Sequence, residues 1–517
     1  MSRGALNAAQ RLADLEDLRD GPPLDVLVVG GGVTGAGAAL DAATRGLRVG
    51  LVERRDLAWG TSRWSSKLVH GGLRYLAQGA VGIAMESARE RGVLLTRTAP
   101  HLVRPITLVV PLTPGVDAPV ERKTRIGFAL GDGLRRAAGT PARELPRSRR
   151  IGAAEVLRLA PGVRRAGLRG GLLAHDAQLE DDARLVVALA RTAAAHGARV
   201  VTRCGALELG GDGARLRDER SGETFDVRAR AVINATGVWA GELAEGLHLQ
   251  PSRGTHVVLG LDRLGGLAGS LNVPVPGERN RWVFAIAQRN GVAYAGITDE
   301  PAPGPIPDVP EAPAADVEFL LRTLSAALEV PLEPGDVLGA YAGLRPLVAD
   351  PDSAGATSDL SREHAVVRGG GGLVSVVGGK LTTYRRMAQD AVDAAIDAGG
   401  LDAAGPCRTR AVPLIGAAPR QALAAIPAPA RLVDRHGTEA PAVLARAGGD
   451  PELLAPVAPG LDVLCVEVLH ALAAEGAMDA ADVLDRRTRI GLVTRDRARA
   501  TAAVEALVSA GRQASPV

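Results

Sequence analysis

The hydrophobic pattern at the start of the chain is that of a strand, a helix and a second strand. Residues 25–29, DVLVV, are a run of apolar side chains of the kind that is buried in a parallel sheet. Residues 34–46, TGAGAALDAATRG, have helical spacing and end at a glycine suited to a helix C-terminus. Residues 47–53, LRVGLVE, return to a strand pattern. These segments predict a βαβ unit.

The pattern changes period several times further along the chain. Strands and amphipathic helices are predicted in five segments: 80–98 (helix), 105–112 (strand), 179–200 (helix, then strand), 229–244 and 372–399 (each strand, glycine turn, helix). Residues 251–300 instead hold short alternating runs, THVVLGL, RWVFAIA and GVAYAGIT, which indicate antiparallel strands. Residues 406–517 are nearly all helix-forming and predict a separate helical domain.

Composition sets the scale of these units. A chain of 517 residues is long enough for two to four domains. Hydrophobic residues make up 46% of the chain but aromatic residues only 2%, so the cores must consist of Ala, Val and Leu.

Charge is balanced overall but not locally. The net charge of +3, from 61 basic and 58 acidic residues, argues against a dedicated nucleic-acid-binding protein. Residues 121–150 are the exception, with nine Arg or Lys against three Asp or Glu. This basic segment is either an ordinary solvated surface or a patch that faces anionic lipid headgroups.

Cysteine spacing and hydropathy limit the setting of the protein. Cys204, Cys407 and Cys465 are far apart and form no CxxC pair, so we expect neither a disulfide framework nor a metal site, and a reducing cytoplasmic setting fits. The first residues lack the apolar core of a signal peptide. The longest uncharged, mostly apolar run, 26–40, is too short to span a bilayer, so any membrane contact should be peripheral.

A glycine motif lies between the first predicted strand and helix. Gly30, Gly32 and Gly35 have the spacing GxGxxG, and Glu53 ends the second strand. The glycines permit a tight turn, close approach of a pyrophosphate and close helix packing, while an acid at the position of Glu53 accepts hydrogen bonds from an adenosine ribose. The complete unit predicts a dinucleotide site rather than a merely glycine-rich turn.

A second motif favours FAD over NAD. Residues 233–240, INATGVWA, resemble the closing strand of an FAD-binding domain, where the backbone near Gly237 passes the cofactor. The motif lies well downstream of the first, as in flavoproteins whose chain returns to the nucleotide domain after an excursion. A strand-to-helix turn without a ligand is the alternative.

Further motifs make a family resemblance close. They are TSRWSSKLVHGGLRYL (61–76), RGTHVV (253–258), YAGLRPLV (341–348), SREH (361–364), GGKLTTYRRMA (378–388) and DVLDRRTRIGL (482–492). In this order they resemble the FAD-dependent glycerol-3-phosphate dehydrogenases, the aerobic, membrane-associated flavoenzymes that pass electrons to quinone. The resemblance begins near residue 25 and covers nearly the whole chain.

The resemblance implies an α/β fold with three parts. A Rossmann-like FAD-binding domain with a parallel sheet would comprise residues 20–80, 165–250 and 340–400. A substrate domain with an antiparallel sheet, carrying the basic segment, would comprise residues 81–164 and 251–339. A C-terminal helical domain would comprise residues 401–517, with packing and dimerisation as its roles.

The resemblance also implies which residues contact FAD. Besides Gly30, Gly32, Gly35 and Glu53, it assigns cofactor contacts to Thr61, Ser62, Ser65, Ser66, Lys67, Leu68, His70, Gly237, Gly379 and Thr382. A helix beginning near Lys380 would direct its positive N-terminal dipole at the flavin.

The substrate is expected to be a phosphate ester, which carries roughly two negative charges. The resemblance assigns substrate binding to Arg74, Tyr75, Arg345, Arg362 and Lys380. We expect the four cations to converge on one phosphate, because Arg provides bidentate contacts, although any one Arg taken alone is more often a surface ion pair. The segment between Arg362 and Lys380 is short for the family, so Arg362 is the least well supported.

The reaction also requires a base, because the hydroxyl on the middle carbon of the substrate loses a proton as hydride leaves. His256 is the first candidate, since histidine titrates near working pH, and a purely structural histidine is the alternative. His70 is the second candidate. Arg345 could instead lower the pKa of the hydroxyl, and Lys380 could act in either way.

The resulting hypothesis is oxidation of sn-glycerol 3-phosphate to dihydroxyacetone phosphate, with electrons passed through FAD to a quinone at the inner face of the cytoplasmic membrane. A homodimer is a candidate assembly. The alternatives are a peroxide-forming glycerophosphate oxidase, an FAD-dependent amine or amino-acid oxidase of the same fold, and a flavin-bound redox sensor without turnover. No counterpart of the oxidase insertion is evident in the sequence, which favours the dehydrogenase.

Overall fold

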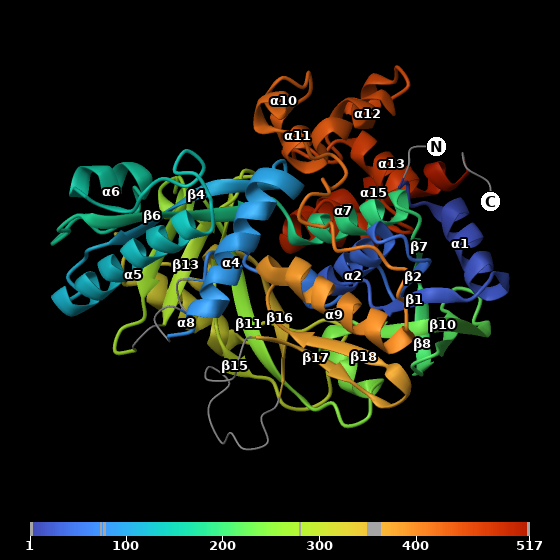
Figure 1. The fold of residues 1–517 in the computed structure, drawn as a ribbon. Coiled ribbons are helices and arrows are strands. Elements are labelled where there is room, and N and C mark those ends of the chain that lie inside the picture. Colours follow the sequence, from blue (N-terminus) through green and yellow to red (C-terminus); the bar gives the residue numbers. More distant parts are fainter. Residues whose placement is uncertain (1–3, 73–74, 76–78, 279–280, 349–362, 514–517) are drawn as a thin grey trace.

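The computed structural model contains two large sheets and a cap of helices (Figure 1). It describes residues 4–72, 75, 79–278, 281–348 and 363–513. The fold class predicted from the sequence, an α/β protein with a C-terminal helical domain, is confirmed.

The first sheet is built around the predicted βαβ unit. Its strands, in spatial order, are β17 (His364–Arg368), β18 (Val374–Gly378), β10 (Thr224–Asn234), β1 (Leu24–Val29), β2 (Val49–Glu53) and β7 (Arg199–Thr202), and the hairpin β8 (Cys204–Leu209) and β9 (Gly213–Asp218) joins at β10. The central strands β18, β10, β1, β2 and β7 are mutually parallel, whereas β17 is antiparallel.

Helices cover both faces of this sheet. They are α1 (Ala8–Asp20), α2 (Val33–Thr44), α7 (Asp182–Ala195) and α9 (Tyr384–Gly399). On β1, Val26 and Val28 belong to the core that includes α2, α7 and α9, while Leu27 and Val29 belong to the core that includes α1. Burial on both faces explains why this strand is a continuous apolar run in the sequence.

The second sheet is mostly antiparallel and extends away from the first. Its strands, in spatial order, are β15 (Glu300–Pro301), β11 (Leu249–Gly260), β14 (Val292–Gly296), β13 (Trp282–Ala287), β12 (Ser270–Pro274), β4 (Val103–Pro111), β6 (Gly171–Leu179) and β3 (Leu68–Val69), with β16 (Val337–Val348) also on β11 and β5 (Arg149–Ile151) on β6. The associated helices are α4 (Val81–Val93), which continues as a π-helical turn (Leu94–Thr98), α5 (Ala118–Ala137), α6 (Ala153–Leu159) and α8 (Ala314–Ser325).

Three strands belong to a different sheet from the one that the expected domain bounds imply. The sequence placed the residues of β3, β6 and β16 with the FAD-binding domain, but all three pair in the second sheet. β16 lies antiparallel to β11 from the pair Leu249–Val348 to the pair Leu259–Val337. Strand partners so far apart in sequence leave no local signal. A smaller difference is that the predicted helix after β10 is a short 3₁₀ segment, Gly237–Glu242.

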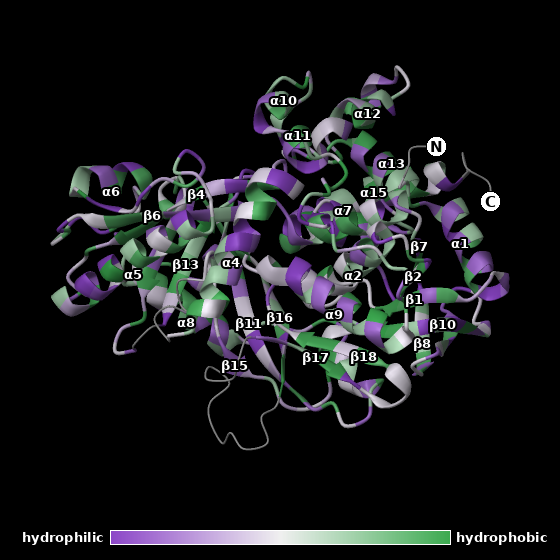
Figure 2. Ribbon diagram, viewed as in Figure 1, coloured by the Kyte–Doolittle hydropathy of each residue, from purple (hydrophilic) through white to green (hydrophobic). Residues whose placement is uncertain are grey.

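The C-terminal part is helical, as predicted. Its helices are α10 (Arg420–Ala424), α11 (Ala430–His436), α12 (Ala440–Ala445), α13 (Cys465–Ala474), α14 (Ala480–Asp482) and α15 (Thr494–Gln513). Figure 2 shows the strands of the first sheet as mainly hydrophobic, while the exposed faces of α1 and α5 carry many hydrophilic residues. Among the described residues, no helix is long and apolar enough to cross a membrane.

Candidate functional site

The glycine turn between β1 and α2 is packed so closely that side chains are excluded. Gly30 has a φ of +112°, and a Cβ there would lie 2.5 Å from the carbonyl oxygen of Ala235. A Cβ on Gly35 would lie 1.9 Å from the carbonyl oxygen of Gly30. The backbone turn, the end of β10 and the start of α2 therefore meet without intervening side chains, as a dinucleotide cradle requires.

Glu53 and Ser62 complete the edge of this cradle. Glu53 Oε2 accepts a hydrogen bond from the backbone N–H of Gly31 at 2.6 Å, and Oε1 accepts one from that of Arg55 at 2.7 Å. Burial raises the pKa of Glu53, although both N–H groups oppose this shift. Ser62 Oγ accepts from the backbone N–H of Val33 at 2.9 Å, at the N-terminus of α2.

The serine-rich loop that follows is held by a buried ion pair. Lys67 Nζ donates to Asp182 Oδ2 at 2.7 Å and to the carbonyl oxygen of Arg63 at 2.8 Å. Burial, reinforced by Arg489, lowers the pKa of Lys67 to about 8. Ser65 Oγ accepts from the backbone N–H of Lys67 at 3.0 Å. The Lys67 side chain thus fixes the loop from inside, and the cofactor contact expected at this position stays a prediction.

His256 lies beside this loop. Its Nε2 is 2.8 Å from Ser66 Oγ, and its ring stacks on Tyr341 with 4.8 Å between centroids. The side chain is fully buried, and its Nδ1 has no hydrogen-bond partner within the described part of the chain. Burial, with the positive charges of Lys67 and Arg345, lowers the pKa of His256 well below 6.5. This direction is opposite to the titration near working pH that made His256 the first candidate, and its role as the base stays a prediction.

Arg345 reaches the same region from β16. Its Nη1 donates to Ser252 Oγ at 3.1 Å and to Asp299 Oδ1 at 3.2 Å, and its Nη2 donates to the carbonyl oxygen of Thr298 at 3.1 Å. A Cβ on Gly254 would lie 2.4 Å from Nη2, so this glycine lets the guanidinium lie across β11.

Lys380 marks a second part of the site, formed by α4 and the turn before α9. Its Nζ lies 3.6 Å from the centroid of the Tyr75 ring and donates to Ser87 Oγ at 3.0 Å. The same Tyr75 ring also stacks with the ring of His70, with 6.4 Å between the two centroids. Lys380 also lines a cavity of about 200 Å³, together with Gly82, Ile83, Glu86, Glu363, His364 and Thr383.

The remaining predicted residues lie at several positions. Thr61 Oγ1 donates to the carbonyl oxygen of Leu344 at 2.6 Å, so it ties the loop to β16. Leu68 is half-buried in β3. Gly237 and Gly379 have φ of +63° and +71°, and Thr382 is buried in the 3₁₀ turn Leu381–Thr383. Arg74 and Arg362 lie outside the described residues, so the expected four-cation cluster stays a prediction.

Comparison with known proteins places these features in a family. A model described as FAD dependent oxidoreductase matches residues 25–385, and one described as the C-terminal domain of alpha-glycerophosphate oxidase matches residues 407–511. Glycerol-3-phosphate dehydrogenase 1 of Mycobacterium tuberculosis is 55% identical over 511 residues, or 98% of each chain. The chain belongs to the FAD-dependent glycerol-3-phosphate dehydrogenase family. The family resemblance found in the sequence is thereby confirmed.

Two further relatives support the membership. Glycerol-3-phosphate dehydrogenase 2 of the same organism is 40% identical and covers 94% of this chain and 84% of the relative. The structure of the glycerol-3-phosphate dehydrogenase from Bacillus halodurans complexed with FAD matches with a TM-score of 0.76 at 26% identity, covering 99% and 95% of the two chains. The protein is therefore an FAD-dependent oxidoreductase, and FAD is its cofactor.

The residues present fit FAD. The closely packed glycine turn lets a pyrophosphate approach the backbone at the N-terminus of α2, and Glu53 stands where a ribose acceptor belongs. Sequence reasoning missed the buried acids Asp56 and Asp182, which hold the neighbouring segment. For Asp182, the only local indication was the acidic pair Asp181–Asp182 at the start of a predicted helix, a pattern that is equally typical of ordinary helix capping.

Proposed function

We propose that the protein oxidises sn-glycerol 3-phosphate to dihydroxyacetone phosphate and passes the electrons to a membrane quinone. Bound FAD supplies the acceptor for the hydride that leaves the middle carbon of the substrate. The relatives that are 55% and 40% identical over most of the chain are named glycerol-3-phosphate dehydrogenases, which supports this substrate.

The observation that carries the proposal is a pair of cations at the predicted substrate positions. Arg345 on β16 donates to Ser252 Oγ on β11, the strand that carries His256, and Lys380 in the turn before α9 lies over the ring of Tyr75. A doubly charged phosphate needs such cations, whereas an amine substrate does not. In this proposal, Arg74 and Arg362 complete the phosphate site, and Tyr75 orients Lys380.

We assign the proton transfer to Ser66 and His256. Burial keeps the imidazole of His256 neutral, so Nε2 can offer a lone pair, while the lowered pKa makes it a weaker base than an ordinary histidine. Ser66 Oγ, 2.8 Å away, passes the proton of the substrate hydroxyl to Nε2 by giving up its own hydrogen as it receives the new one. Arg345 adds a positive charge near the developing alkoxide.

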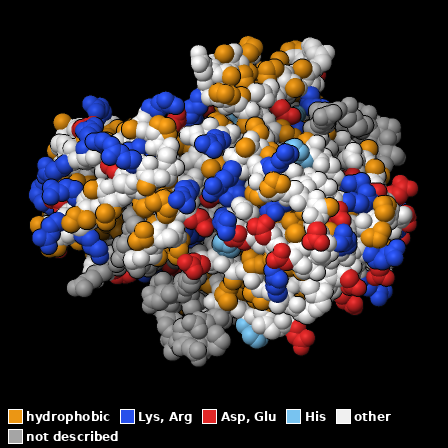
Figure 3. All heavy atoms as spheres, viewed as in Figure 1, with side chains coloured by type: hydrophobic (Ala, Val, Ile, Leu, Met, Phe, Trp, Pro, Cys, Tyr) orange, Lys and Arg blue, Asp and Glu red, His pale blue; other side chains and the backbone are white. Residues whose placement is uncertain are grey.

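Delivery of electrons to a lipid-soluble quinone requires contact with the bilayer. Helix α5 exposes Ile126 and Leu130 beside Arg122, Lys123 and Arg125, and Figure 3 shows Lys and Arg side chains gathered with hydrophobic ones over this end of the molecule. Such a mixture suits peripheral binding to an anionic surface, here the inner face of the cytoplasmic membrane. Arg135 differs from its neighbours, because it is buried and donates to the carbonyl oxygen of Thr140.

The proposal is tested by mixing the purified holoprotein with glycerol 3-phosphate under anaerobic conditions while the visible absorption of oxidised flavin is followed. Glycerol and sarcosine serve as the unphosphorylated and amine controls. Rapid bleaching by the phosphate ester alone is expected. Bleaching by sarcosine, or equal bleaching by glycerol, would overturn the phosphate-site argument. Stoichiometric peroxide release in air would instead identify an oxidase.

A further inference from the structure

Three buried arginines of the C-terminal part contact residues of the FAD-binding part. Arg486, Arg487 and Arg489 lie in and just after a π-helical turn, Val483–Arg487, and are 1%, 1% and 7% exposed. Burying three guanidinium groups is costly unless each finds a charged or polar partner. Besides Asp482 and the carbonyl oxygens of Glu475 and Asp485 in the C-terminal part, their partners lie in the start of α7 and in residues 56–67, the segment that leads from Glu53 to the serine-rich loop.

Arg486 and Arg487 hold the beginning of this segment. Arg487 Nη1 and Nη2 each donate to one oxygen of Asp56 at 2.8 Å, and Arg486 Nε donates to Asp56 Oδ2 at 2.5 Å. The Arg487 contact is a bidentate pair between a planar guanidinium and a carboxylate, which fixes both distance and orientation. The pKa of Asp56 is lowered by these two arginines against the effect of burial.

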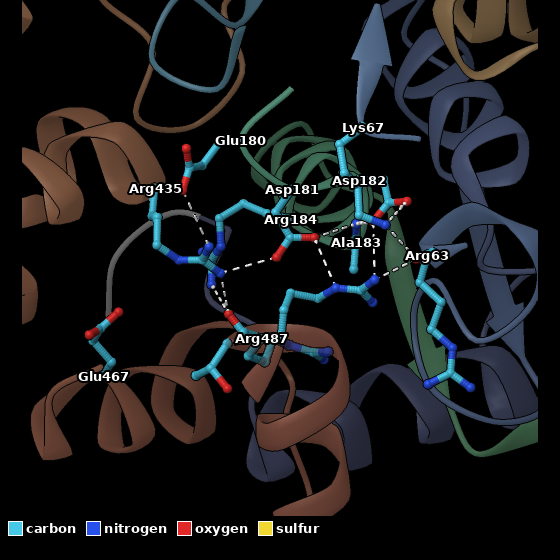
Figure 4. A network of polar contacts seen from close by, with 12 residues as sticks. Arg63, Lys67, Glu180, Asp181, Asp182, Ala183, Arg184, Arg435, Glu467 and Arg487 are labelled. Carbon is cyan, nitrogen blue, oxygen red and sulfur yellow. Dashed lines mark hydrogen bonds and ion pairs between the residues drawn. The ribbon is translucent and has the colours of Figure 1, made fainter. Parts of the chain in front are cut away.

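Arg489 holds the end of the segment. Its Nη2 donates to the carbonyl oxygen of Arg63 at 2.6 Å, and the guanidinium lies 3.7 Å from Asp181 and 3.8 Å from Asp182. Figure 4 shows Lys67 beside Asp182 at the start of α7, with the Arg63 side chain directed away from the acids and Arg487 on the C-terminal part.

A short chain of contacts connects this cluster to the reacting groups. Asp182 Oδ2 accepts from Lys67 Nζ at 2.7 Å and from the backbone N–H of Ser65 at 2.9 Å. The next residue, Ser66, contacts His256 Nε2. Arg489 therefore sets the position of Ser66 through the backbone that precedes it, without touching the substrate region itself.

The backbone conformations point to the same boundary. Among the described residues, four non-glycine residues have positive φ: Ala58, Lys67, Arg203 and Arg489. Ala58 and Lys67 lie within the held segment, Arg489 is one of the holding arginines, and Arg203 pairs with Asp479 and Asp482 of the C-terminal part. Left-handed backbone is unfavourable for these residue types and persists only where surrounding contacts impose it.

We propose that the C-terminal domain is a working part of the FAD site, in which Arg486, Arg487 and Arg489 are positioning residues for segment 56–67. Their removal should release Ser62 from the α2 N-terminus and Ser66 from His256, so both FAD affinity and flavin reduction should suffer. The expected effect on flavin reduction rests on the proposed function, whereas the expected effect on FAD affinity does not.

The test compares two bidentate arginine–carboxylate pairs across the same boundary; both arginines are buried, but Asp56 is 1% exposed and Glu439 is 23% exposed. Arg487→Gln breaks the bidentate pair with Asp56. Arg191→Gln breaks the bidentate pair of Arg191 with Glu439, at 2.6 and 2.9 Å, which has no contact with segment 56–67. For each full-length protein, the dissociation constant for FAD is measured from flavin fluorescence and the melting temperature of the apoprotein is measured separately. Arg489→Asn is the third variant, because Asn tolerates a positive φ.

We expect Arg487→Gln and Arg489→Asn to weaken FAD binding by about tenfold or more, and Arg191→Gln by less than about twofold, whatever the loss of melting temperature in each variant. If FAD binding weakens in all three variants in proportion to the loss of melting temperature, the arginines only stabilise the contact between the domains, and the proposal is overturned. If Arg487→Gln does not fold, Arg487→Lys, which keeps the charge but loses the fork, must still weaken FAD binding for the proposal to stand.

Measuring flavin reduction distinguishes a failure of the positioning proposal from a failure of the proposed substrate. With FAD saturating, Arg489→Asn should slow reduction by glycerol 3-phosphate by about tenfold, an effect that Ser66→Ala should reproduce at saturating FAD. Loss of FAD affinity without any reduction of the wild-type flavin by glycerol 3-phosphate would refute the proposed substrate and leave the positioning role intact.

Discussion

His256 occupies a setting that keeps its imidazole neutral. The ring is buried, stacks on Tyr341, and lies near the positive charges of Lys67 and Arg345. A histidine pKa below its usual value means that the neutral form persists as pH falls through 6.5. The residue is therefore neutral at all working pH values, and the same burial makes it a weaker base than an ordinary histidine.

We therefore expect the His256 ring to show no titration between pH 6 and 8. The measurement is histidine-selective ¹⁵N NMR of the holoprotein, with the His256 resonances identified by their loss in His256→Gln. A ring that protonates near pH 6.5 would contradict the neutral setting. Exposed His248 provides an internal comparison in the same spectra.

The proposed role of Arg345 in phosphate binding can be tested by comparing Arg345→Lys with the same substitution at an exposed arginine. Arg345→Lys keeps the charge but loses the simultaneous contacts to Ser252, Asp299 and the carbonyl of Thr298. We expect the KM for glycerol 3-phosphate to rise by about tenfold or more, corresponding to roughly 1.4 kcal/mol or more of binding. Arg368→Lys, at an exposed arginine paired with Asp397, should leave the KM unchanged. An unchanged KM in Arg345→Lys would remove Arg345 from the site.

At the scale of elements, helix α13 depends on one buried carboxylate. Glu467 Oε1 accepts from the backbone N–H of Leu464 at 2.8 Å and from Arg431 Nη1 at 2.6 Å, which caps the helix and neutralises the charge. Burial would raise the pKa of Glu467, but His436 and Arg431 outweigh it and lower the pKa from 4.5 to about 2.

This shift predicts a specific acid sensitivity. Because the folded-state pKa is lower than the unfolded one, Glu467 stabilises the protein above pH 4.5, and this contribution is lost as pH falls towards 2. It amounts to about 3 kcal/mol at most. Glu467→Gln should lower the melting temperature at pH 7 and flatten its dependence between pH 4.5 and 2, relative to wild type. An unaltered slope would contradict the assignment, and exposed Glu318→Gln is the control.

At the scale of the whole molecule, the basic and apolar surface of α5 lies at the end of the second sheet, away from the C-terminal helices (Figure 1). Its exposed residues include Ile126 and Leu130, each 54% exposed, among several cations. A bilayer that meets this end would contact the substrate-side sheet and leave the helical cap in water.

We expect flotation with anionic vesicles to depend on this surface. Each basic residue near such a membrane contributes about 1 kcal/mol, so replacing Arg122, Lys123 and Arg125 with Gln should weaken partitioning by roughly a hundredfold. Replacement of three exposed arginines elsewhere, Arg322, Arg368 and Arg495, is the matched control. Equal loss in both triple variants would indicate net charge alone, and retained binding in the α5 variant would exclude this face.

The sequence by itself determined the features that depend on neighbouring residues. The βαβ unit, the glycine turn with Glu53 and the helical C-terminal part are all encoded in local spacing, because period, turn geometry and capping act over a few residues. Those features, with the family motifs, sufficed to identify the FAD-binding fold and its family.

Only the tertiary structure decided which groups meet. The pairing of β16 with β11, the burial that keeps His256 neutral, and the contacts of Asp56 and Asp182 join segments that lie as much as 431 residues apart. An arginine has the same local appearance whether it lies in solvent or clamps a buried carboxylate, because its environment is set by residues distant in sequence. The role proposed for the C-terminal arginines therefore became visible only in the folded molecule.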